Sequence, residues 1–341
     1  DIGLGIGEIC EVTVQSHSPV IGRTLSNLRP QSWILGAIYR DGKLVVPHGK
    51  TEIRAGDKCL LIGDPAILEG ISDYFQRGSS EFPLQFGSRL CLLEQPAGRF
   101  PDLKECDWIL SHTEAQGLGV FCHGMGLPPF IQEFFQDRVD LVSSELTAQW
   151  PSNLLEQTDS LDCGVVLLAA PQVTWKDKVG LGNQDLFAAL DRSSEPFLIS
   201  RGSYPYKKIL LAVSPSPGSL RAGELAVDVA RKFEAELTVM GVLPPDFVVG
   251  TEYEERMQRA LEATRSRANL YSRRVEVKVI RGNPVHQVLR NSEDFDLLIV
   301  AHRRGRRFSL IQQDVSRHLV ARTSCSVLVL PFSKDDLNAG S

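Results

Sequence analysis

Gln287-Val-Leu-Arg-Asn-Ser-Glu-Asp-Phe-Asp296 followed by Leu297-Leu-Ile-Val-Ala301 is the stretch that decides the fold. It predicts a short helix over 284–290 that leads into an apolar strand over 297–301. The same pattern occurs earlier, where Asn153-Leu-Leu-Glu-Gln-Thr-Asp-Ser-Leu-Asp162 precedes Val165-Val-Leu-Leu-Ala169. An internal match of this kind indicates two copies of one structural unit.

A second match lies downstream of the first in each copy. Ala189-Leu-Asp-Arg-Ser-Ser-Glu-Pro-Phe-Leu-Ile199 corresponds to Val320-Ala-Arg-Thr-Ser-Cys-Ser-Val-Leu-Val329. The offset between the copies changes by only a few residues from one match to the next. The two matches together predict tandem domains with the same fold.

Around the first stretch, strands and helices alternate through the C-terminal unit. The predicted strands are 209–213, 237–242, 275–280, 297–301 and 327–330, and the predicted helices are 219–233, 252–271, 284–290 and 310–321. Apolar strands joined by crossover helices are typical of a doubly wound parallel sheet.

Linker composition divides the chain into three units and a tail. Gly/Ser/Pro clusters at 77–80 and 201–205 separate residues 1–78, 84–200 and 206–333, and 334–341 is a polar tail. The first unit has short strands, an Asp41-Gly42 hairpin signal and a closing helix over 65–75. The predicted fold class is α/β: a small α+β domain followed by two doubly wound parallel-sheet domains.

Composition limits the kind of partner. The 341 residues include 37 basic and 42 acidic side chains, which give a net charge of −5. So weak a balance argues against nucleic acid and against an acidic membrane surface as partners. The longest apolar runs are shorter than the roughly 20 residues that cross a bilayer. The seven cysteines form no C-x-x-C pair, which predicts reduced core thiols and a cytoplasmic location.

The third unit resembles the universal stress protein family. The resemblance rests on Lys208-Ile-Leu-Leu-Ala-Val213, Arg281-Gly-Asn-Pro284, Asp296-Leu-Leu-Ile-Val300 and Cys325-Ser-Val-Leu-Val-Leu-Pro331. The second unit resembles the family in its C-terminal half. ATP-binding members carry an acid after the first strand and a glycine-rich phosphate loop, and this chain departs from both. Phosphate-binding candidates by position are therefore Ser214, Arg303, Arg304, Gly305, Arg306 and Gln313.

Two interpretations of the arginine-rich loop stay open. The side chains of Arg303, Arg304, Arg306 and Arg307 could grip phosphate at the carboxyl end of a parallel strand. The simpler interpretation, which we favour, is a solvated basic loop or one that pairs with Asp314, since most charge runs are solvated faces. ATP hydrolysis is not expected.

The first unit resembles the TrkA-C domain, also called the RCK C-terminal domain, of potassium-uptake regulators. The resemblance rests on Ser18-Pro-Val-Ile-Gly-Arg-Thr-Leu-Ser-Asn-Leu28, Ile38-Tyr-Arg-Asp-Gly42, Pro47, and Ile53-Arg-Ala-Gly-Asp57 with Leu60-Leu-Ile-Gly63. It implies a homodimer whose cleft holds a small ligand. Arg23, Asn27, Arg40 and His48 are the candidate cleft residues, although polar residues of this kind are more often ordinary surface.

Catalytic and metal sites are not expected from the sequence. Cys122 and His123 are adjacent and would point to opposite faces of a strand, and the seven histidines lack metal-ligand spacing. Asp102, Glu105 and Asp107 fall in a helix that we expect to be solvated. We therefore expect no enzyme, no metal and no fixed cofactor, with a nucleotide such as ATP or a cyclic dinucleotide as the candidate ligand.

Three functions remain open. The favoured one is a cytoplasmic regulatory module of a potassium or other cation transport system, such as a channel, an uptake protein or a cation/proton antiporter. The second is a stand-alone nucleotide-binding universal stress protein, and the third is a plain structural dimeriser without a ligand. Because the chain begins at Asp1 rather than at methionine, we expect an inner-membrane transporter domain either upstream in the same chain or as a separate subunit.

Overall fold

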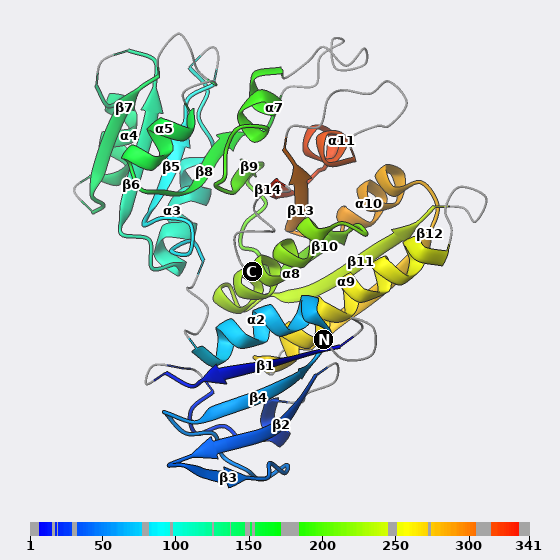
Figure 1. Cartoon of the computed structure of the whole chain (residues 1–341). Coiled ribbons are helices and arrows are strands. Elements are labelled where there is room, and N and C mark those ends of the chain that lie inside the picture. Colours follow the sequence, from blue (N-terminus) through cyan, green and yellow to red (C-terminus); the bar gives the residue numbers. More distant parts are fainter. Residues whose placement is uncertain are drawn as a thin grey trace.

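The computed structural model describes residues 7–15, 18, 20–28, 33–76, 82–95, 98–124, 126–136, 138–146, 151, 154–171, 184–244, 251–271, 274–304 and 315–333. These residues build a four-stranded sheet in the N-terminal part and a ten-stranded sheet in the rest (Figure 1). The mixed α/β architecture confirms the predicted fold class.

The small sheet is antiparallel throughout, with the strand order β1-β4-β2-β3. Its elements are β1 (Glu8–Thr13), α1 (Leu25–Leu28), β2 (Trp33–Arg40), β3 (Lys43–Val45), β4 (Lys58–Gly63) and α2 (Pro65–Gln76). The predicted hairpin joins β2 to β3, and Asp41 and Gly42 have φ angles of 50° and 74°. Positive φ at both loop residues is what a two-residue I′ turn requires, so the Asp-Gly pair fits its turn.

The first half of the large sheet contains five parallel strands in the order β9-β8-β5-β6-β7. Its elements are β5 (Arg89–Leu93), α3 (Leu103–His112), β6 (Gly117–Cys122), α4 (Pro129–Phe135), β7 (Leu141–Glu145), α5 (Leu154–Ser160), β8 (Cys163–Ala169), α7 (Gln184–Leu190) and β9 (Phe197–Ser200).

The second half contains five parallel strands in the order β12-β11-β10-β13-β14. Its elements are β10 (Lys208–Val213), α8 (Pro217–Lys232), β11 (Glu236–Leu243), α9 (Thr251–Leu270), β12 (Val275–Arg281), α10 (Pro284–Ser292), β13 (Leu297–Arg303), α11 (Val315–Arg322) and β14 (Ser326–Phe332). Counted along each half, both halves have the strand order 3-2-1-4-5, so they are two copies of one fold.

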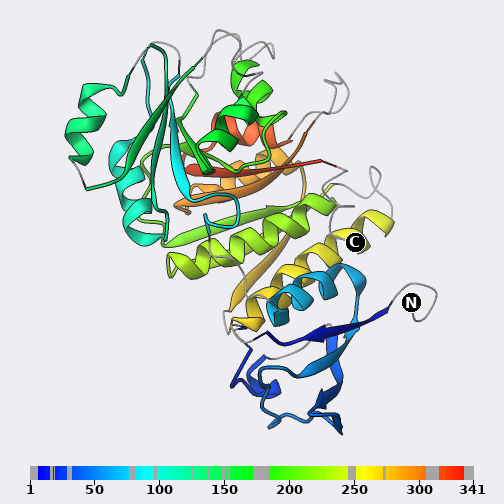
Figure 2. The ribbon, with the colours of Figure 1, turned by 60° about the vertical axis from the view of Figure 1, so that its left-hand side comes forward.

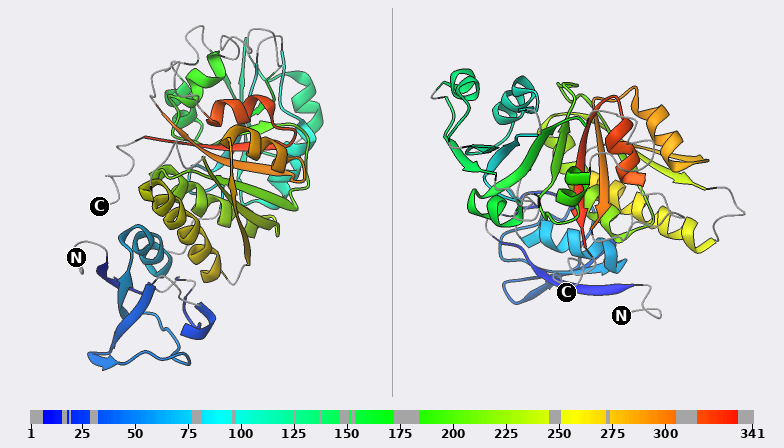
Figure 3. Two further views of the ribbon diagram at one scale, coloured as in Figure 1. Left: turned by 90° about the vertical axis from the view of Figure 1, so that its right-hand side faces the viewer. Right: turned by 90° about the horizontal axis from the view of Figure 1, so that it is seen from above.

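The two halves join through their last strands. β9 pairs antiparallel with β14, with Leu198 opposite Leu328. The predicted repeat is confirmed, because α5 and β8 occupy the places of α10 and β13, and α7 and β9 those of α11 and β14. The copies therefore pair within one chain and form one continuous sheet (Figure 3).

Strand residues alternate between two cores that lie on opposite faces of the large sheet. Ile209 and Leu211 pack with α8 and α9, whereas Leu210 packs with residues of α10 and α11. Both cores include strands of both halves. Six of the seven cysteines are buried, which agrees with the prediction that they are core residues.

The small domain is attached to the large sheet through α2. One side of α2 packs on the small sheet, and the other side contacts α9 and the neighbouring α8 (Figure 2). Leu270 of α9 belongs to the core of the small domain. A unit of about 70 residues buries little surface alone, and this contact supplies the additional burial that it needs.

Candidate functional site

The carboxyl edge of the second half carries a cluster of hydroxyl groups. Ser214 follows β10, and its Oγ lies 2.9 Å from Oγ of Ser216 and 3.1 Å from Oγ of Ser219. Its backbone N–H also donates to Ser219 Oγ over 3.0 Å. The ring of Phe332 lies where a Cβ atom at Gly218 would be, so it covers part of the first turn of α8. The hydroxyls mainly bond one another, and Ser214 itself is exposed.

The two described arginines of the basic loop differ in their environment. Arg303 ends β13 and is exposed. Arg304 is half-buried, and its guanidinium donates to the carbonyl of Ser193, in the first half of the sheet, over 3.2 Å. Gly305, Arg306 and Gln313, together with Arg307 and Asp314, lie outside the described residues.

A charged cluster joins the two halves beside this loop. The buried ring of His302 on β13 bonds Oδ1 of Asp191 through Nε2 at 3.0 Å and Oγ of Ser316 through Nδ1 at 2.8 Å. Oδ2 of Asp191 accepts from the guanidinium of Arg317 over 2.6 Å. Asp191 follows α7 of the first half, whereas the other residues belong to β13 and α11 of the second. This cluster forms a polar connection between the copies.

The environment of Asp191 favours its carboxylate form. Burial opposes ionisation, but the hydrogen bond and charge of His302 and the charge of Arg317 outweigh it, so the pKa of Asp191 is lowered. Because the pKa of Asp191 is lower in the folded chain than in the unfolded chain, its ionisation stabilises the fold above the unfolded pKa of about 3.9. This stabilisation is lost as the pH falls through the folded pKa.

We therefore expect protonation of the Asp191 carboxylate to contribute to the loss of folding stability in acid. Asp191→Asn should flatten the dependence of the urea midpoint on pH below about pH 4, because its amide does not titrate there. Urea titrations between pH 3 and pH 6 measure the slope. A slope equal to that of the wild-type chain would contradict the effect.

Two of the polar residues predicted for the small domain have local roles in the structure. Arg40 bonds both carboxylate oxygens of the buried Asp57, over 2.7 and 2.8 Å, and the carbonyl of Glu52. The hydrogen bond with Asp57 raises the pKa of Arg40. His48 is exposed, and its backbone N–H donates to Thr51 Oγ1. Asn27 lies on α1, and its side chain is outside the described part of the structure.

Arg23 lies at the junction of the small domain with the large sheet. Its guanidinium donates to Tyr74 Oη over 2.6 Å and to the carbonyl of Leu270, at the last residue of α9. Cationic donors near a helix C-terminus satisfy its unpaired carbonyls and interact favourably with the helix dipole. The ring of Tyr74 also contacts that of Tyr271, with centroids 4.9 Å apart. Arg23 therefore joins two domains across 247 positions of sequence.

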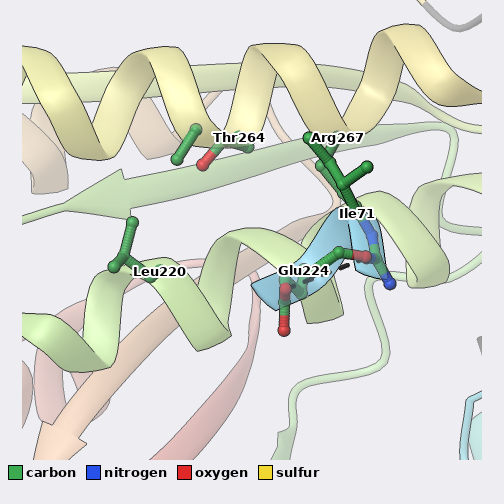
Figure 4. A pocket seen from close by; sticks show the side chains of 7 residues that line it. Ile71, Leu220, Glu224, Thr264 and Arg267 are labelled. Atoms are coloured by element: carbon green, nitrogen blue, oxygen red, sulfur yellow. Dashed lines mark hydrogen bonds and ion pairs between the residues drawn. The ribbon is translucent and has the colours of Figure 1, made fainter. Parts of the chain in front are cut away.

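A small cavity lies at this junction, between α2, α8 and α9 (Figure 4). Its lining includes Ile71, Glu224 and Arg267, and the Arg267 guanidinium donates to the carbonyl of Gly70. The cavity volume is about 20 Å³, which is room for a water molecule rather than for a ligand. The junction is therefore closely packed.

Replacing Arg23 should loosen the small domain without unfolding the large sheet. Arg23→Met removes the charged donor to α9, and losing hydrogen bonds of this kind costs about 1.5–3 kcal/mol. In calorimetry we expect the small domain to unfold at a lower temperature than in the wild-type chain. The unfolding temperature of the large sheet should be unchanged. Arg54→Met, which alters an exposed arginine of the same domain, is the control. Equal transitions in both variants would contradict the junction role.

The outer face of the small sheet carries an exposed apolar row. Ile9, Ile62 and Ile34 lie side by side across β1, β4 and β2. Ile34 is 58% exposed and Leu44 on β3 is 59% exposed. α2 packs against the opposite face, so this row lies on the side away from the large sheet, where the exposed ion pair of Lys58 with Glu11 also lies. A surface of this kind is typical of a protein interface.

Glu105 corrects a sequence-based expectation. We expected the helix with Asp102, Glu105 and Asp107 to be solvated, but Glu105 is 0% exposed. Its carboxylate accepts from Ser200 Oγ, Tyr206 Oη, Ser326 Oγ and the backbone N–H of Gly202, over 2.5 to 3.1 Å. These donors come from both halves of the sheet, so Glu105 locks the tandem interface. Burial, followed by the charge of Glu105, raises the pKa of Tyr206 well above its usual value.

The polar residues that connect the copies at this cluster were not predicted from the sequence. Asp191, His302 and Arg317 carry no motif signal. Their partners lie 111 and 126 positions away, beyond any local pattern. The repeat aligns α7 with α11, and it is the antiparallel pairing of β9 with β14 that brings the ends of these elements together.

The described residues show neither a membrane-spanning helix nor a metal site. None of the helices there has both the length and the apolar character needed to cross a bilayer. Those residues also contain no group of three or more His, Cys, Asp or Glu side chains arranged to hold a metal ion.

Comparisons with known proteins identify two domains. Residues 205–331 match the universal stress protein family, and residues 9–76 match the TrkA-C domain. A Trk system potassium uptake protein TrkA homologue of Archaeoglobus fulgidus is 34% identical over 68 residues, which is 19% of this chain and 16% of that relative. A universal stress protein of Methanocaldococcus jannaschii is 24% identical over 153 residues, covering 41% of this chain and 90% of that relative.

A solved structure shows the fold of the large sheet. The crystal structure of a universal stress protein from Archaeoglobus fulgidus covers 72% of this chain and 98% of its own, with a TM-score of 0.52 and 14% identity. The fold and the matches define a multidomain α/β protein. The chain carries a TrkA-C domain at residues 9–76 and a universal stress protein domain at residues 205–331, with a second copy of the latter fold between them.

Proposed function

We propose that this chain is a regulatory module of a potassium or other cation transport system. The TrkA-C domain dimerises through the outer face of its sheet and senses a small ligand, while the paired copies form a rigid scaffold behind it. The observation that supports this best is the arrangement of the TrkA-C domain: one face of its sheet carries the exposed apolar row, and the other face is attached through α2 to α8 and α9. The match to a Trk potassium uptake protein over the same residues supports the transport role.

In this proposal the chain acts by binding rather than by catalysis. The ligand is a nucleotide such as ATP or a cyclic dinucleotide, and the cleft between two TrkA-C domains is its site, with Asn27 and His48 as cleft candidates. The ligand shifts the population of dimer geometries and thereby biases a gate. The transporter domain is part of a longer chain or a separate subunit, and the module works on the cytoplasmic side without nucleic acid.

In this proposal the junction at α2 connects the universal stress protein domain to the TrkA-C domain. α8 and α9 begin beyond the carboxyl ends of β10 and β11, the edge at which parallel α/β sheets bind ligands. Leu220 and Glu224 of α8 line the junction cavity together with Gly70 and Ile71 of α2, and Leu220 directly follows Ser219 of the hydroxyl cluster. A displacement at that edge would therefore reach the TrkA-C domain through packed helices.

Transport measurements test this function. In cells from which the segment encoding this chain has been deleted, we expect altered uptake of Rb⁺, a tracer for K⁺, and restoration when the chain is returned. A stand-alone nucleotide-binding protein is the second candidate, favoured by the hydroxyl cluster at Ser214. Unchanged Rb⁺ uptake together with tight ATP binding that is lost on changing Ser214 and Arg303 would favour this second function.

A further inference from the structure

A cavity of about 300 Å³ lies at the amino edge of the large sheet, in the second copy of the fold. It is enclosed by the C-terminal ends of α8 and α9 and by the first residues of β11 and β12. Parallel α/β sheets usually bind ligands at the carboxyl edge, so this cavity is at the opposite end of the strands. Cavities that hold small molecules measure roughly 300–1,000 Å³, and this one reaches that range.

The floor of the cavity is apolar. It is formed by Val227 and Ala230 of α8, Leu237 of β11 and Ala268 of α9, each at most 5% exposed. The two alanines carry only a methyl group, so they leave free the space that a longer side chain would fill. Because protein interiors contain few spaces larger than a water molecule, a cavity of this size with an apolar floor suits the apolar part of a ligand.

The rim of the cavity carries charges of both signs. Glu234, Glu236 and Arg274 line it and are exposed. Leu237 is paired with Val275 on the neighbouring strand, so Glu236 and Arg274, each one residue earlier, also lie at neighbouring positions. Among the described residues, these three charged side chains form neither an ion pair nor a hydrogen bond. Both a carboxylate and a guanidinium are therefore available to a ligand.

The turn after α8 determines where the two carboxylates lie. Glu234 has a φ angle of 52°, and the N–H of Ala235 donates to the carbonyl of Ala230 over 2.8 Å. A residue in this left-handed conformation commonly ends a helix. Glu236 then begins β11, and its N–H donates to the carbonyl of Lys207 over 2.8 Å. The backbone thus holds both glutamates at the rim, and a site ordered in advance loses less conformational entropy on binding.

We propose that this cavity binds a free amino acid with an apolar side chain. The ammonium group pairs with Glu236 and Glu234, the carboxylate pairs with Arg274, and the side chain lies on the apolar floor. The charges of the rim select this class of ligand, because a molecule with one charge would satisfy only one sign. Guanidinium groups bind carboxylates with a paired geometry, which fixes the orientation of the ligand. The proposal goes beyond cation transport and does not depend on it.

Calorimetric titrations of the full chain with L-leucine and L-phenylalanine test the site. We expect phenethylamine, which lacks the carboxylate, to bind about tenfold more weakly than L-phenylalanine. Hydrocinnamate, which lacks the ammonium group, should be weakened by about the same factor, because each analogue loses one charge-assisted contact. Absence of binding by both amino acids would overturn the proposal, and so would an analogue that binds as tightly as L-phenylalanine.

Two exposed variants assign the charges to their partners. Arg274→Gln should weaken L-phenylalanine about tenfold and leave phenethylamine unchanged, since the amine has no carboxylate to lose. Glu236→Gln should weaken L-phenylalanine and leave hydrocinnamate unchanged. Arg259→Gln and Glu255→Gln, which remove exposed charges from α9, are the matched controls. L-Phenylalanine affinities that are equal in the rim variants and in the controls would contradict this assignment.

Hydrogen exchange on the wild-type chain locates the ligand without relying on a variant. Saturating L-phenylalanine should slow amide exchange in 227–235 and 268–271, which surround the cavity, and leave 315–322 on α11 unchanged. Slower exchange confined to the carboxyl edge of the sheet, or unchanged exchange in 227–235, would place the ligand elsewhere and overturn the proposal.

Discussion

Replacing Glu105 with glutamine should lower the free energy of unfolding by about 3 kcal/mol, since breaking a buried network that contains a charge costs about that much. The carboxylate accepts from three hydroxyls and one backbone N–H, and an amide can accept through only one of its two heads. The new NH₂ group would also face hydroxyls that now donate. Urea titration followed by circular dichroism measures the loss.

Glu133→Gln is the matched control, because Glu133 is an exposed glutamate on α4 of the same half. An exposed substitution of this type changes stability by no more than about 0.5 kcal/mol. Tyr206→Phe should fall between the two, because it removes one of the four donors. Equal midpoints for Glu105→Gln and Glu133→Gln would show that the cluster does not hold the two copies together.

Charge on the outer face of the small sheet should disrupt the proposed dimer. Ile34 lies at the β2 end of the apolar row and is 58% exposed, so Ile34→Glu adds a charge to the interface while disturbing the fold little. We expect the dimer dissociation constant to rise about hundredfold, which corresponds to losing roughly 2.7 kcal/mol at an interface contact. Analytical ultracentrifugation over a concentration series measures the constant.

Val279→Glu is the control for this change. Val279 is 49% exposed on β12, at the far edge of the large sheet, and it receives the same type of substitution. Its sedimentation should match that of wild type. A monomeric wild-type chain, or equal dissociation of both variants, would contradict dimerisation through the outer face.

Repetition and turn chemistry made most of the fold predictable. The Gln287–Ala301 pattern and its earlier match lie on α10 with β13 and on α5 with β8, because buried parallel strands need continuous apolar runs whatever surrounds them. The Asp41-Gly42 pair predicted the β2–β3 turn because few residue pairs accept positive φ. Helix α1, of four residues, was too short to leave a periodic signal.

The polar interactions could not be predicted for a different reason. Glu105 and Asp107 are neighbours on one helix, yet Glu105 is buried whereas Asp107 forms a partly exposed ion pair with Arg138. What separates them is the position of the second copy, since Ser326 lies 221 positions from Glu105. Arg23 likewise acquires its role from Leu270 of another domain. Side chains whose partners come from tertiary packing leave no local pattern.

Rb⁺ uptake in a rescue experiment tests the central claim most directly. Cells that lack the segment encoding this chain would receive the wild-type, Ile34→Glu or Val279→Glu form at matched expression. We predict that wild type and Val279→Glu restore Rb⁺ uptake and its regulation, whereas Ile34→Glu does not, because it cannot form the regulatory dimer. Uptake that is the same with and without the chain, or restored equally by all three forms, would contradict a role in cation transport through the TrkA-C dimer.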